Sequence, residues 1–538
     1  MSNLKGFEEL SVFLECSFNT TPTMASLKKY IDLIAEFGYT HFYLGLTDGY
    51  KIKGEPYFNF GRGGYTTEQL QEIDAYARQK GIEVRANIQV LGHLHYMRWH
   101  YCYRDLFDTE DILMVGKEEV YEFVEKMFAT ISAGLQSRTI HIGMDETFNL
   151  GLGRYLKENG YTERTELMLT HLQRVVEIAK KYGYTCEIWS DMFFRIAQGD
   201  EFKESGVIPE GVRESIPEGV RLVHFGYGKK ETEELADRLV VHKALCDEVL
   251  FAGGAWKQHG LAPDNAFSIR MIEDQIKTCR EANLKHYMVT IWSNEGGHCS
   301  NFAILPTLFA AAEFARGKSK AEIDKDRFKE ITGVAFDDFM LLDNMNNPFF
   351  KELDVPNNRC YWGLLSDVFM GTHDLMLDEN TNEAYARLVK KYEAIQGGEY
   401  QLMFDDFILY AKVLSIKMNL GVQLRKAYRE GDKEKLEYYA KTAIPQMIAY
   451  MQEYMEHFQK RWLSENMAFG LEVHHLYYGG QIERWKYVIY RLEQYLADGT
   501  PIEEMERDEI EASLSPEYRD EDTCMMENPR TLVSYCTY

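Results

Sequence analysis

Residues 138–146 read RTIHIGMDE, a run in which a strand pattern ends in two adjacent acids. Ile140 and Ile142 alternate with a polar residue, as the side chains of a buried strand do. Asp145 and Glu146 follow at the point where the strand is expected to become a loop. In parallel α/β barrels the chemistry lies at this carboxyl end of the strands. The stretch therefore predicts a parallel fold whose active site contains both acids.

Short apolar strands followed by helical segments repeat through about residue 320. Eight strands are expected, at Ser11–Cys16, Thr40–Leu46, Glu83–Gln89, Thr139–Gly143, Thr185–Trp189, Arg221–Phe225, Val249–Gly253 and His286–Trp292. Helical segments fall between them, including Met24–Phe37, Thr67–Lys80, Lys117–Ser132, Arg164–Tyr182 and Ala266–Glu281. This count predicts a (β/α)8 TIM barrel over residues 1–320. A doubly wound open sheet is the alternative, but no Gly-x-Gly-x-x-Gly follows any strand.

Beyond residue 320 the strand patterns thin out and long helical runs replace them. The clearest are Asp405–Tyr428, Lys433–Phe458 and Gly480–Leu496. We therefore expect an α-helical C-terminal domain over residues 321–538. The last segment, Ser513–Tyr538, has no clear period and is expected to be an extended tail.

The adjacency of the two acids restricts the chemistry that they can perform. Successive side chains of a strand point to opposite faces, so Asp145 and Glu146 cannot easily flank one glycosidic bond as nucleophile and acid. Instead, one acid can protonate the leaving group while its neighbour orients a nucleophile that the substrate supplies, the oxygen of a 2-acetamido group. A solvated surface pair is the alternative in a chain with 85 acidic residues.

The motif His-Ile-Gly-x-Asp-Glu at residues 141–146 resembles that of the family 20 glycoside hydrolases, the β-N-acetylhexosaminidases. It resembles in particular the bacterial cytoplasmic members that carry a helical C-terminal domain. The resemblance covers nearly the whole chain, through Tyr57-Phe58, Arg62-Gly63, Tyr65, residues 88–94, residues 251–257 and residues 484–489. It implies an exo-acting, retaining hydrolase of terminal β-linked N-acetylhexosamine, with no cofactor or metal and a helical domain that often supports a homodimer.

We expect a different catalytic role for each of five residues. Glu146 is the general acid/base, which requires a pKa near the working pH. Asp145 accepts a hydrogen bond from the acetamido N–H and stabilises the positive oxazolinium intermediate. The resemblance implies that His93 hydrogen-bonds Glu146, that Asp48 fixes the tautomer of His93, and that Tyr227 binds the acetamide oxygen.

Three of the seven tryptophans fall at the ends of predicted barrel strands. They are Trp189, Trp256 and Trp292, at the ends of the fifth, seventh and eighth strands. Aromatic walls at these positions would pack the acetamido methyl and exclude water from the intermediate. Packing within the barrel is the alternative for any one of them.

The chain departs from the family pattern at two sugar-binding positions. Phe18 stands where the resembled enzymes have an arginine, and Asn294 stands where they have an acid. Glu295 is one residue out of register as a substitute, and Arg62 and His298 are further candidates for binding sugar hydroxyls. Losing an arginine and a carboxylate redirects recognition. We therefore expect a substrate other than plain terminal GlcNAc, either an epimer or a 6-substituted N-acetylhexosamine.

Composition excludes several classes of partner. With 538 residues, 45% of them hydrophobic, the chain can bury a large core. A formal charge of −25 opposes binding to nucleic acid or to an anionic membrane, and no window predicts a membrane span. The nine cysteines form no Cys-x-x-Cys pair, and the N-terminus lacks a signal pattern, so a cytoplasmic location is expected.

Two other functions compete with this interpretation. A catalytically weak or non-catalytic sugar-binding relative is suggested by Phe18 and Asn294, although a mere binder needs no general acid. A metal-dependent hydrolase would use the histidines 93, 95, 100 and 141, but no His-Glu-x-x-His or comparable group occurs.

Overall fold

The computed structural model describes residues 4–195, 211–258, 260–293, 296–351, 356–371, 374 and 377–506. Two of the candidate sugar-binding residues, Asn294 and Glu295, lie outside the described residues, as does the predicted tail Ser513–Tyr538. The described chain divides into two compact units. The barrel unit comprises Met1–Ala255, Ser268–Trp292 and Leu308–Ile323, and the helical unit comprises Trp256–Phe267, Ser293–Thr307 and Asp324–Tyr538.

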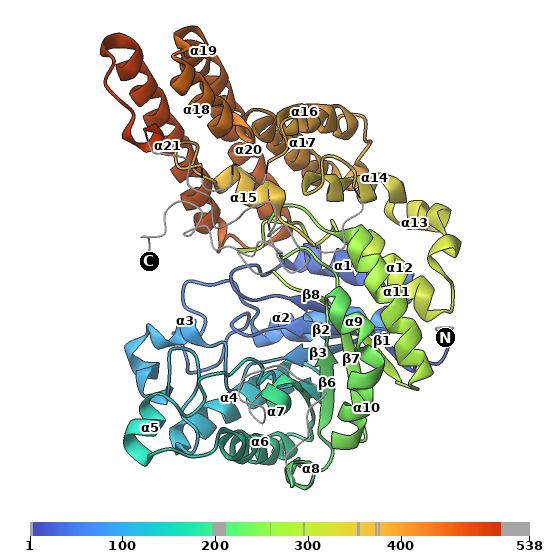
Figure 1. The fold of residues 1–538 in the computed structure, drawn as a ribbon. Helices are drawn as coiled ribbons and strands as arrows, with labels where there is room; N and C mark the ends of the chain where they lie inside the picture. Colours follow the sequence, from blue (N-terminus) through green and yellow to red (C-terminus); the bar gives the residue numbers. More distant parts are fainter. Residues whose placement is uncertain are drawn as a thin grey trace. The chain divides into compact units, whose positions relative to one another are not determined.

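Eight parallel strands form a closed barrel in chain order, with β8 paired to β1 (Figure 1). The strands are β1 (Glu9–Glu15), β2 (His41–Gly45), β3 (Glu83–Asn87), β4 (Thr139–His141), β5 (Thr185–Trp189), β6 (Arg221–Phe225), β7 (Val249–Gly254) and β8 (His286–Ile291). The predicted TIM barrel is confirmed, and the open doubly wound sheet is excluded. Strand β4 ends two residues before the predicted Gly143, because Gly143 has a left-handed φ of 70°.

The helices of the barrel unit lie around the strands, as Figure 1 shows. They are α1 (Met24–Phe37), α2 (Thr67–Gln79), α3 (His95–Arg98), α4 (Glu118–Gly134), α5 (Arg154–Asn159), α6 (Arg164–Lys181), α7 (Asp191–Arg195), α8 (Val212–Ser215), α9 (Lys229–Glu233), α10 (Leu235–Leu245), α11 (Asn265–Glu281) and α12 (Leu305–Ala315). Local signals set the ends of α1. The Thr23 hydroxyl accepts a hydrogen bond from the N–H of Ser26, and Gly38 ends the helix with a φ of 95°.

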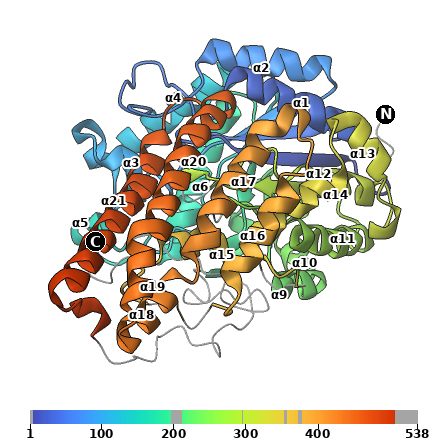
Figure 2. The same cartoon turned by 90° about the horizontal axis from the view of Figure 1, so that it is seen from above.

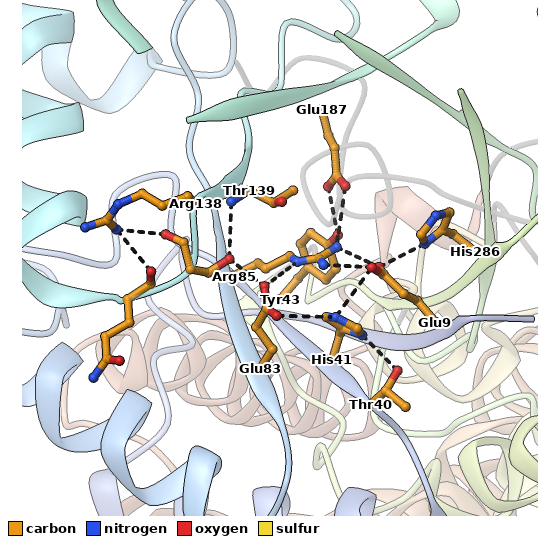
Figure 3. Close-up of polar contacts among 12 residues, drawn as sticks. Glu9, Thr40, His41, Tyr43, Glu83, Arg85, Arg138, Thr139, Glu187 and His286 are labelled. Atoms are coloured by element: carbon orange, nitrogen blue, oxygen red, sulfur yellow. Dashed lines mark hydrogen bonds and ion pairs between the residues drawn. The ribbon is translucent and has the colours of Figure 1, made fainter. Parts of the chain in front are cut away.

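The interior of the barrel is apolar toward the carboxyl ends of the strands and charged toward their beginnings. The apolar layer contains Phe13, Tyr43, Trp189, Val223, Leu250, Ala252 and Met288. Below it, the buried Arg85 donates to both carboxylate oxygens of Glu9, at 2.7 and 2.9 Å, and to the Tyr43 hydroxyl at 2.7 Å (Figure 3). The Tyr43 hydroxyl in turn donates to Glu187 at 2.8 Å, and His286 lies 2.9 Å from Glu9. We call this the floor network.

The helical unit contains four long helices that run side by side: α16 (Thr381–Tyr392), α17 (Gln401–Lys417), α20 (Ile444–Glu465) and α21 (Leu471–Asp498) (Figure 2). Shorter helices are α13 (Lys325–Thr332), α14 (Phe336–Met340), α15 (Arg359–Leu365), α18 (Leu420–Glu430) and α19 (Lys433–Tyr438). The helical character of this region was predicted, but the run Asp405–Tyr428 divides at residues 418–419 into α17 and α18.

One helical segment, Gly398–Glu430, is long and apolar enough to cross a membrane by length and composition. The sequence alone predicted no such window. However, 67% of its apolar stretch is buried inside the protein, and the core helix of a soluble protein passes the same test.

Two segments that follow barrel strands belong to the helical unit. Trp256–Phe267 comes after β7, and Ser293–Thr307 comes after β8. Helix α20 anchors the second of these segments from two side chains. Arg461 donates to the carbonyl of His298 at 2.9 Å, and Glu465 accepts from the Ser300 hydroxyl at 2.9 Å. The predicted boundary between residues 320 and 321 means that the chain passes from one domain to the other once. In the structure, the chain passes between the two units after residues 255, 267, 292, 307 and 323.

Candidate active site

The loops after β3 and β4 bring a histidine and the two predicted acids together at the carboxyl end of the barrel. Nε2 of His93 lies 3.2 Å from Oδ2 of Asp145 and 3.8 Å from Oε2 of Glu146. One polar atom from each of the three residues lies within 4.8 Å of the other two. The structure therefore groups three of the five predicted catalytic residues into one cluster.

Strained backbone concentrates around this cluster. Among the described residues, seven non-glycine residues have a positive φ, and five of them follow β1, β3 or β4: Phe18, Asn19, His93, Met144 and Glu146. A left-handed backbone costs free energy for a residue with a Cβ, so such conformations persist where the surrounding structure holds them, often at functional sites. The strain therefore marks the same end of the barrel as the acids do.

Asp145 is held as a carboxylate. Its side chain is 13% exposed, and Oδ1 accepts a hydrogen bond of 2.9 Å from the amide of Gln89. Burial alone raises the pKa of Asp145, but the charge of His93 and the hydrogen bonds from His93 and Gln89 bring it below its ordinary value. Asp145 is thus ionised at neutral pH, as expected for a residue that opposes a developing positive charge.

Gln89 is a site residue that the sequence analysis did not name. Besides donating to Asp145, its carbonyl oxygen accepts the N–H of Met144 at 3.2 Å. A Cβ on Gly143 would lie 2.0 Å from that same oxygen, so only glycine fits beside it. Gln89 follows β3 by two positions. The rule that strand ends carry the chemistry could have selected it, but the same rule selects many residues.

His93 carries the compensating positive charge. Burial lowers the pKa of His93, but the charges and hydrogen bond of the neighbouring Asp145 and Glu146 outweigh this and raise it to about 9. The imidazole is therefore protonated at neutral pH.

Glu146 is the more open of the two acids. Its side chain is 42% exposed, and its backbone N–H donates to Oδ2 of Asp191 at 3.1 Å. Asp191 is buried at the first position of α7, two residues beyond β5, and it too was missed by the sequence analysis. It braces the left-handed backbone of Glu146, whose φ is 51°.

The buried His242 fixes Ser190, the residue before Asp191. Nδ1 of His242 lies 2.8 Å from the carbonyl of Arg238, so this nitrogen must carry the proton. Nε2 of His242 then accepts from the Ser190 hydroxyl at 2.8 Å. Burial lowers the pKa of His242 to about 4, which keeps the ring neutral and this arrangement intact.

Asp48 has different partners from those that the resemblance implied. Oδ1 accepts the N–H of Phe18 at 2.9 Å, and Oδ2 accepts from Arg62 at 2.7 Å. Neither carboxylate oxygen bonds His93, so the expected relay from Asp48 through His93 to Glu146 is wrong in this structure. Burial raises the pKa of Asp48, while Arg62 opposes the shift. Arg62 is engaged with this buried acid and also stacks on Tyr96, 4.9 Å from its ring centre.

Phe18, the residue in place of the family arginine, turns its ring to a histidine. The rings of Phe18 and His95 lie 6.3 Å apart and are nearly parallel, at 9°. The candidate His298 lies in the helical unit, where its Nδ1 is 2.8 Å from the Tyr478 hydroxyl.

Tyr227 lies in the loop after β6, close enough to Asp145 and Glu146 for their charges to act on its hydroxyl. Burial raises the pKa of Tyr227, and the charges of Asp145 and Glu146 raise it further. Its ring stacks on Phe225 at 5.5 Å and 17°. The hydroxyl therefore stays protonated and can donate a hydrogen bond.

Two of the three candidate tryptophans come together in the barrel. The rings of Trp189 and Trp292 lie 6.1 Å apart, and Phe13 packs 4.7 Å from Trp292. Among the described residues the Trp189 indole N–H has no acceptor. Trp256 belongs to the helical unit, where it packs against Phe267 at 6.3 Å.

Of the four histidines considered as metal ligands, only His93 joins the cluster. His141 is buried, and its Nδ1 is taken up by the N–H of Gly143 at 3.1 Å and the amide of Asn87 at 2.9 Å. Burial lowers the pKa of His141 to about 3. His95 packs on Phe18 instead. The four histidines thus do not form one donor set in the described chain, and the group whose spacing could hold an ion is His93, Asp145 and Glu146.

A closed parallel barrel with adjacent acids at the carboxyl ends of its strands is an architecture that glycoside hydrolases use. The family model described as "Glycosyl hydrolase family 20, catalytic domain" matches residues 22–208, and the one described as "Glycoside Hydrolase 20C C-terminal domain" matches residues 337–525. The chain therefore belongs to glycoside hydrolase family 20, which confirms the resemblance found in the sequence.

The individual proteins that this chain resembles have low sequence identity to it. The "Beta-hexosaminidase subunit alpha" of Mus musculus is 23% identical over 213 residues, 35% of this chain and 40% of that protein. The "Beta-hexosaminidase" of Akkermansia muciniphila is 28% identical over 154 residues, 23% of this chain and 31% of that protein. The alignments thus span less than half the length of these relatives. Among solved structures, the β-N-acetylhexosaminidase of Bacteroides fragilis aligns with a TM-score of 0.47 and 17% identity, over 61% of this chain and 70% of that one.

Proposed function

We propose that this protein is an exo-acting, retaining β-N-acetylhexosaminidase that uses substrate-assisted catalysis. The single observation that carries the proposal is the contrast between the two neighbouring acids. Asp145 is only 13% exposed and is ionised, and its side chain is fixed by Gln89 and His93. Glu146 is 42% exposed beside it. One acid is suited to holding a cationic intermediate, and the other is suited to exchanging protons with a substrate.

In the first step, Asp145 accepts a hydrogen bond from the acetamido N–H and thereby points the acetamido oxygen at the anomeric carbon. That oxygen attacks, the bond to the glycosidic oxygen breaks, and Glu146 donates its proton to the departing oxygen. The carboxylate of Asp145 opposes the positive oxazolinium that forms. The Tyr227 hydroxyl, kept protonated by its raised pKa, donates to the acetamide oxygen.

In the second step, Glu146 takes a proton from water, and the oxygen of that water attacks the anomeric carbon. The bond to the acetamido oxygen breaks, so the sugar leaves with its original anomeric configuration. The protonated His93, 3.2 Å from Asp145 and 3.8 Å from Glu146, balances the two carboxylates throughout.

The first test is turnover of a chromogenic N-acetyl-β-glucosaminide, with and without chelator. We expect turnover that the chelator does not change. No turnover of this sugar or of its GalNAc and 6-sulfo-GlcNAc analogues would favour the sugar-binding alternative, and loss with chelator would favour the metal-dependent one. In addition, a thiazoline mimic of the oxazolinium should inhibit far better than the parent sugar, and Asp145→Asn should weaken that inhibition. A covalent adduct trapped by a 2-deoxy-2-fluoro glycoside would contradict substrate assistance.

We further propose that the natural substrate is an epimer or a 6-substituted form of N-acetylhexosamine. The absent arginine at Phe18 and absent acid at Asn294 support this, because a lost carboxylate no longer repels an anionic substituent. The measurement is kcat/KM for p-nitrophenyl GlcNAc, GalNAc and 6-sulfo-GlcNAc side by side, with Asn294→Asp expected to restore preference for GlcNAc. A wide wild-type preference for GlcNAc that Asn294→Asp leaves unchanged would rule this out.

A cytoplasmic location and a homodimer complete the proposal. Free cysteines among the described residues support a reducing compartment: Cys16, Cys102, Cys186, Cys246, Cys279, Cys299 and Cys360. Cell fractionation and sedimentation of the purified chain test the two points separately.

A further inference from the structure

Large aromatic side chains are exposed on the loops after β2 and β3. Tyr57 is 46% exposed and Phe60 62% exposed on the first loop, and Trp99 and Tyr101 are each 87% exposed on the second. The ring of His100 joins the two loops, at 5.4 Å from Tyr57 and 5.7 Å from Phe60. We call these five residues the aromatic platform. Exposed apolar surface of this kind usually marks a binding site.

The aromatic platform is continuous with the candidate active site through the chain. The loop after β2 also carries Asp48, and the loop after β3 also carries His93. Trp99 follows His93 by six residues, a span of roughly 20 Å at most when fully extended, and the helical turn α3 shortens it.

Buried contacts fix the two loops to each other. Arg62 of the first loop stacks on Tyr96 of the second at 4.9 Å, and Phe58 packs against Tyr96 at 6.0 Å. Phe58 and Tyr96 are both buried. The exposed rings are therefore carried on a tied pair of loops, so their position relative to His93 is set by the fold.

We propose that the aromatic platform binds the sugar units beyond the scissile bond of an uncharged oligosaccharide. This inference rests on the proposed function. A terminal sugar fills the site at Asp145 and Glu146, so rings farther along the same loops can reach only the part of the substrate that leaves. Aromatic faces pack against the apolar faces of pyranose rings, while the polar edges of Trp, Tyr and His remain free for hydroxyls.

Charge favours a neutral occupant over a polyanionic glycan. The chain carries a formal net charge of −25, which repels a glycan with many negative charges. A neutral oligosaccharide has no such penalty. The four large rings offer it apolar contact that does not depend on charge.

The test compares substrate lengths. For the wild type we expect kcat/KM to increase from p-nitrophenyl GlcNAc to β-linked GlcNAc trimers and tetramers. The double variant Trp99→Ala/Tyr101→Ala should lower kcat/KM for the longer substrates by about tenfold and leave the p-nitrophenyl sugar unchanged. Tyr161→Ala is the matched control, since Tyr161 is 62% exposed on the barrel unit but lies between α5 and α6.

The outcomes separate this proposal from the proposed function. If the wild type hydrolyses none of p-nitrophenyl GlcNAc, GalNAc and 6-sulfo-GlcNAc, the proposed function itself fails. If one of them is hydrolysed but the double variant and the wild type show the same dependence on substrate length, the aromatic platform is not a sugar site. Sedimentation of both proteins completes the test, because a wild-type dimer that the double variant converts to a monomer would reassign the surface to self-association.

Discussion

Asp145 and Glu146 are adjacent in the chain but have separate environments because the backbone turns between them. Glu146 has a φ of 51°, and its N–H is bonded to Asp191, whereas the side chain of Asp145 is bonded to Gln89 and His93. The exposure of the two side chains differs accordingly, at 13% and 42%. A strained backbone therefore assigns two chemically similar acids to two different tasks.

Glu146→Gln should remove general acid catalysis while preserving shape. We expect kcat/KM to fall by about 10²–10⁴-fold on oligosaccharides, whose leaving groups need a proton. Aryl glycosides with good leaving groups should lose much less. Parallel kinetics on the two substrate types checks this, and equal losses on both would show that Glu146 is not the acid.

The pKa of His93 predicts how activity depends on pH. Because its pKa is raised from 6.5 to about 9, the imidazolium and the stability that it contributes are fully present below pH 6.5 and are lost as the pH rises through about 9. We expect kcat/KM to decline near that pH. In His93→Gln the decline should disappear, and the acidic limb should move to higher pH, because His93 no longer lowers the pKa of Asp145. An unchanged profile would exclude His93 from the active cluster.

At the residue level, the acids and His93 could be predicted because a motif identifies each of them. Their partners could not. Gln89 and Asp191 occupy strand-end positions like many others, and only the folded chain shows which carboxylate or N–H each one meets. Asp48 was assigned a role by resemblance, but Arg62 and the N–H of Phe18 compete successfully for its oxygens.

At the scale of elements, the loop after β4 is shaped by one glycine. Gly143→Ala would place a Cβ 2.0 Å from Oε1 of Gln89, at a φ of 70°. We expect a loss of about 1–3 kcal/mol in the free energy of unfolding from the backbone conformation, and a large loss of kcat as Gln89 is pushed from Asp145. Denaturant unfolding and kinetics measure the two effects.

Gly81→Ala is the matched control for this substitution. Its φ is 77°, but no atom lies within 4 Å of the added Cβ. It should share the cost in stability and leave kcat unchanged. If both variants lose activity alike, the effect of Gly143→Ala comes from general destabilisation and not from Gln89.

Element boundaries were predictable where local chemistry sets them. Helix α1 begins and ends as predicted because Thr23 caps it and Gly38 stops it. Helix α21 instead begins at Leu471, nine residues before the predicted Gly480, because packing within the helical unit continues it. Burial of one face by neighbours is a tertiary effect, and the periodicity of a single segment does not contain it.

At the scale of the whole molecule, the floor network should support the barrel without taking part in chemistry. Arg85→Met removes the buried cation that Glu9 and the buried Glu187 share, so we expect about 3–5 kcal/mol less stability. The kcat of the folded enzyme should not change. Arg174→Met, which removes an exposed pair with Glu118, should cost about 1 kcal/mol or less. Urea unfolding of both variants tests the difference.

The same network predicts sensitivity to acid. Burial raises the pKa of Glu9, but hydrogen bonds from His286 and Arg85 outweigh it, and the pKa lies well below the ordinary value of 4.5. A lowered pKa means that the stabilisation is present above pH 4.5 and is lost as the pH falls through the folded-state value. Glu9→Gln should therefore flatten the dependence of stability on pH below 4.5, as measured by thermal melting across that range.

The repeated passage of the chain between its two units bears on how this protein can change in evolution. The segment Ser293–Thr307 follows a barrel strand but is anchored by Arg461 and Glu465 of α20. A recombination event that exchanged only the region after residue 323 would bring in helices that had evolved to anchor a different segment. The two units are therefore expected to be inherited together, with their sequences diverging in step, even though each is matched by a separate family model.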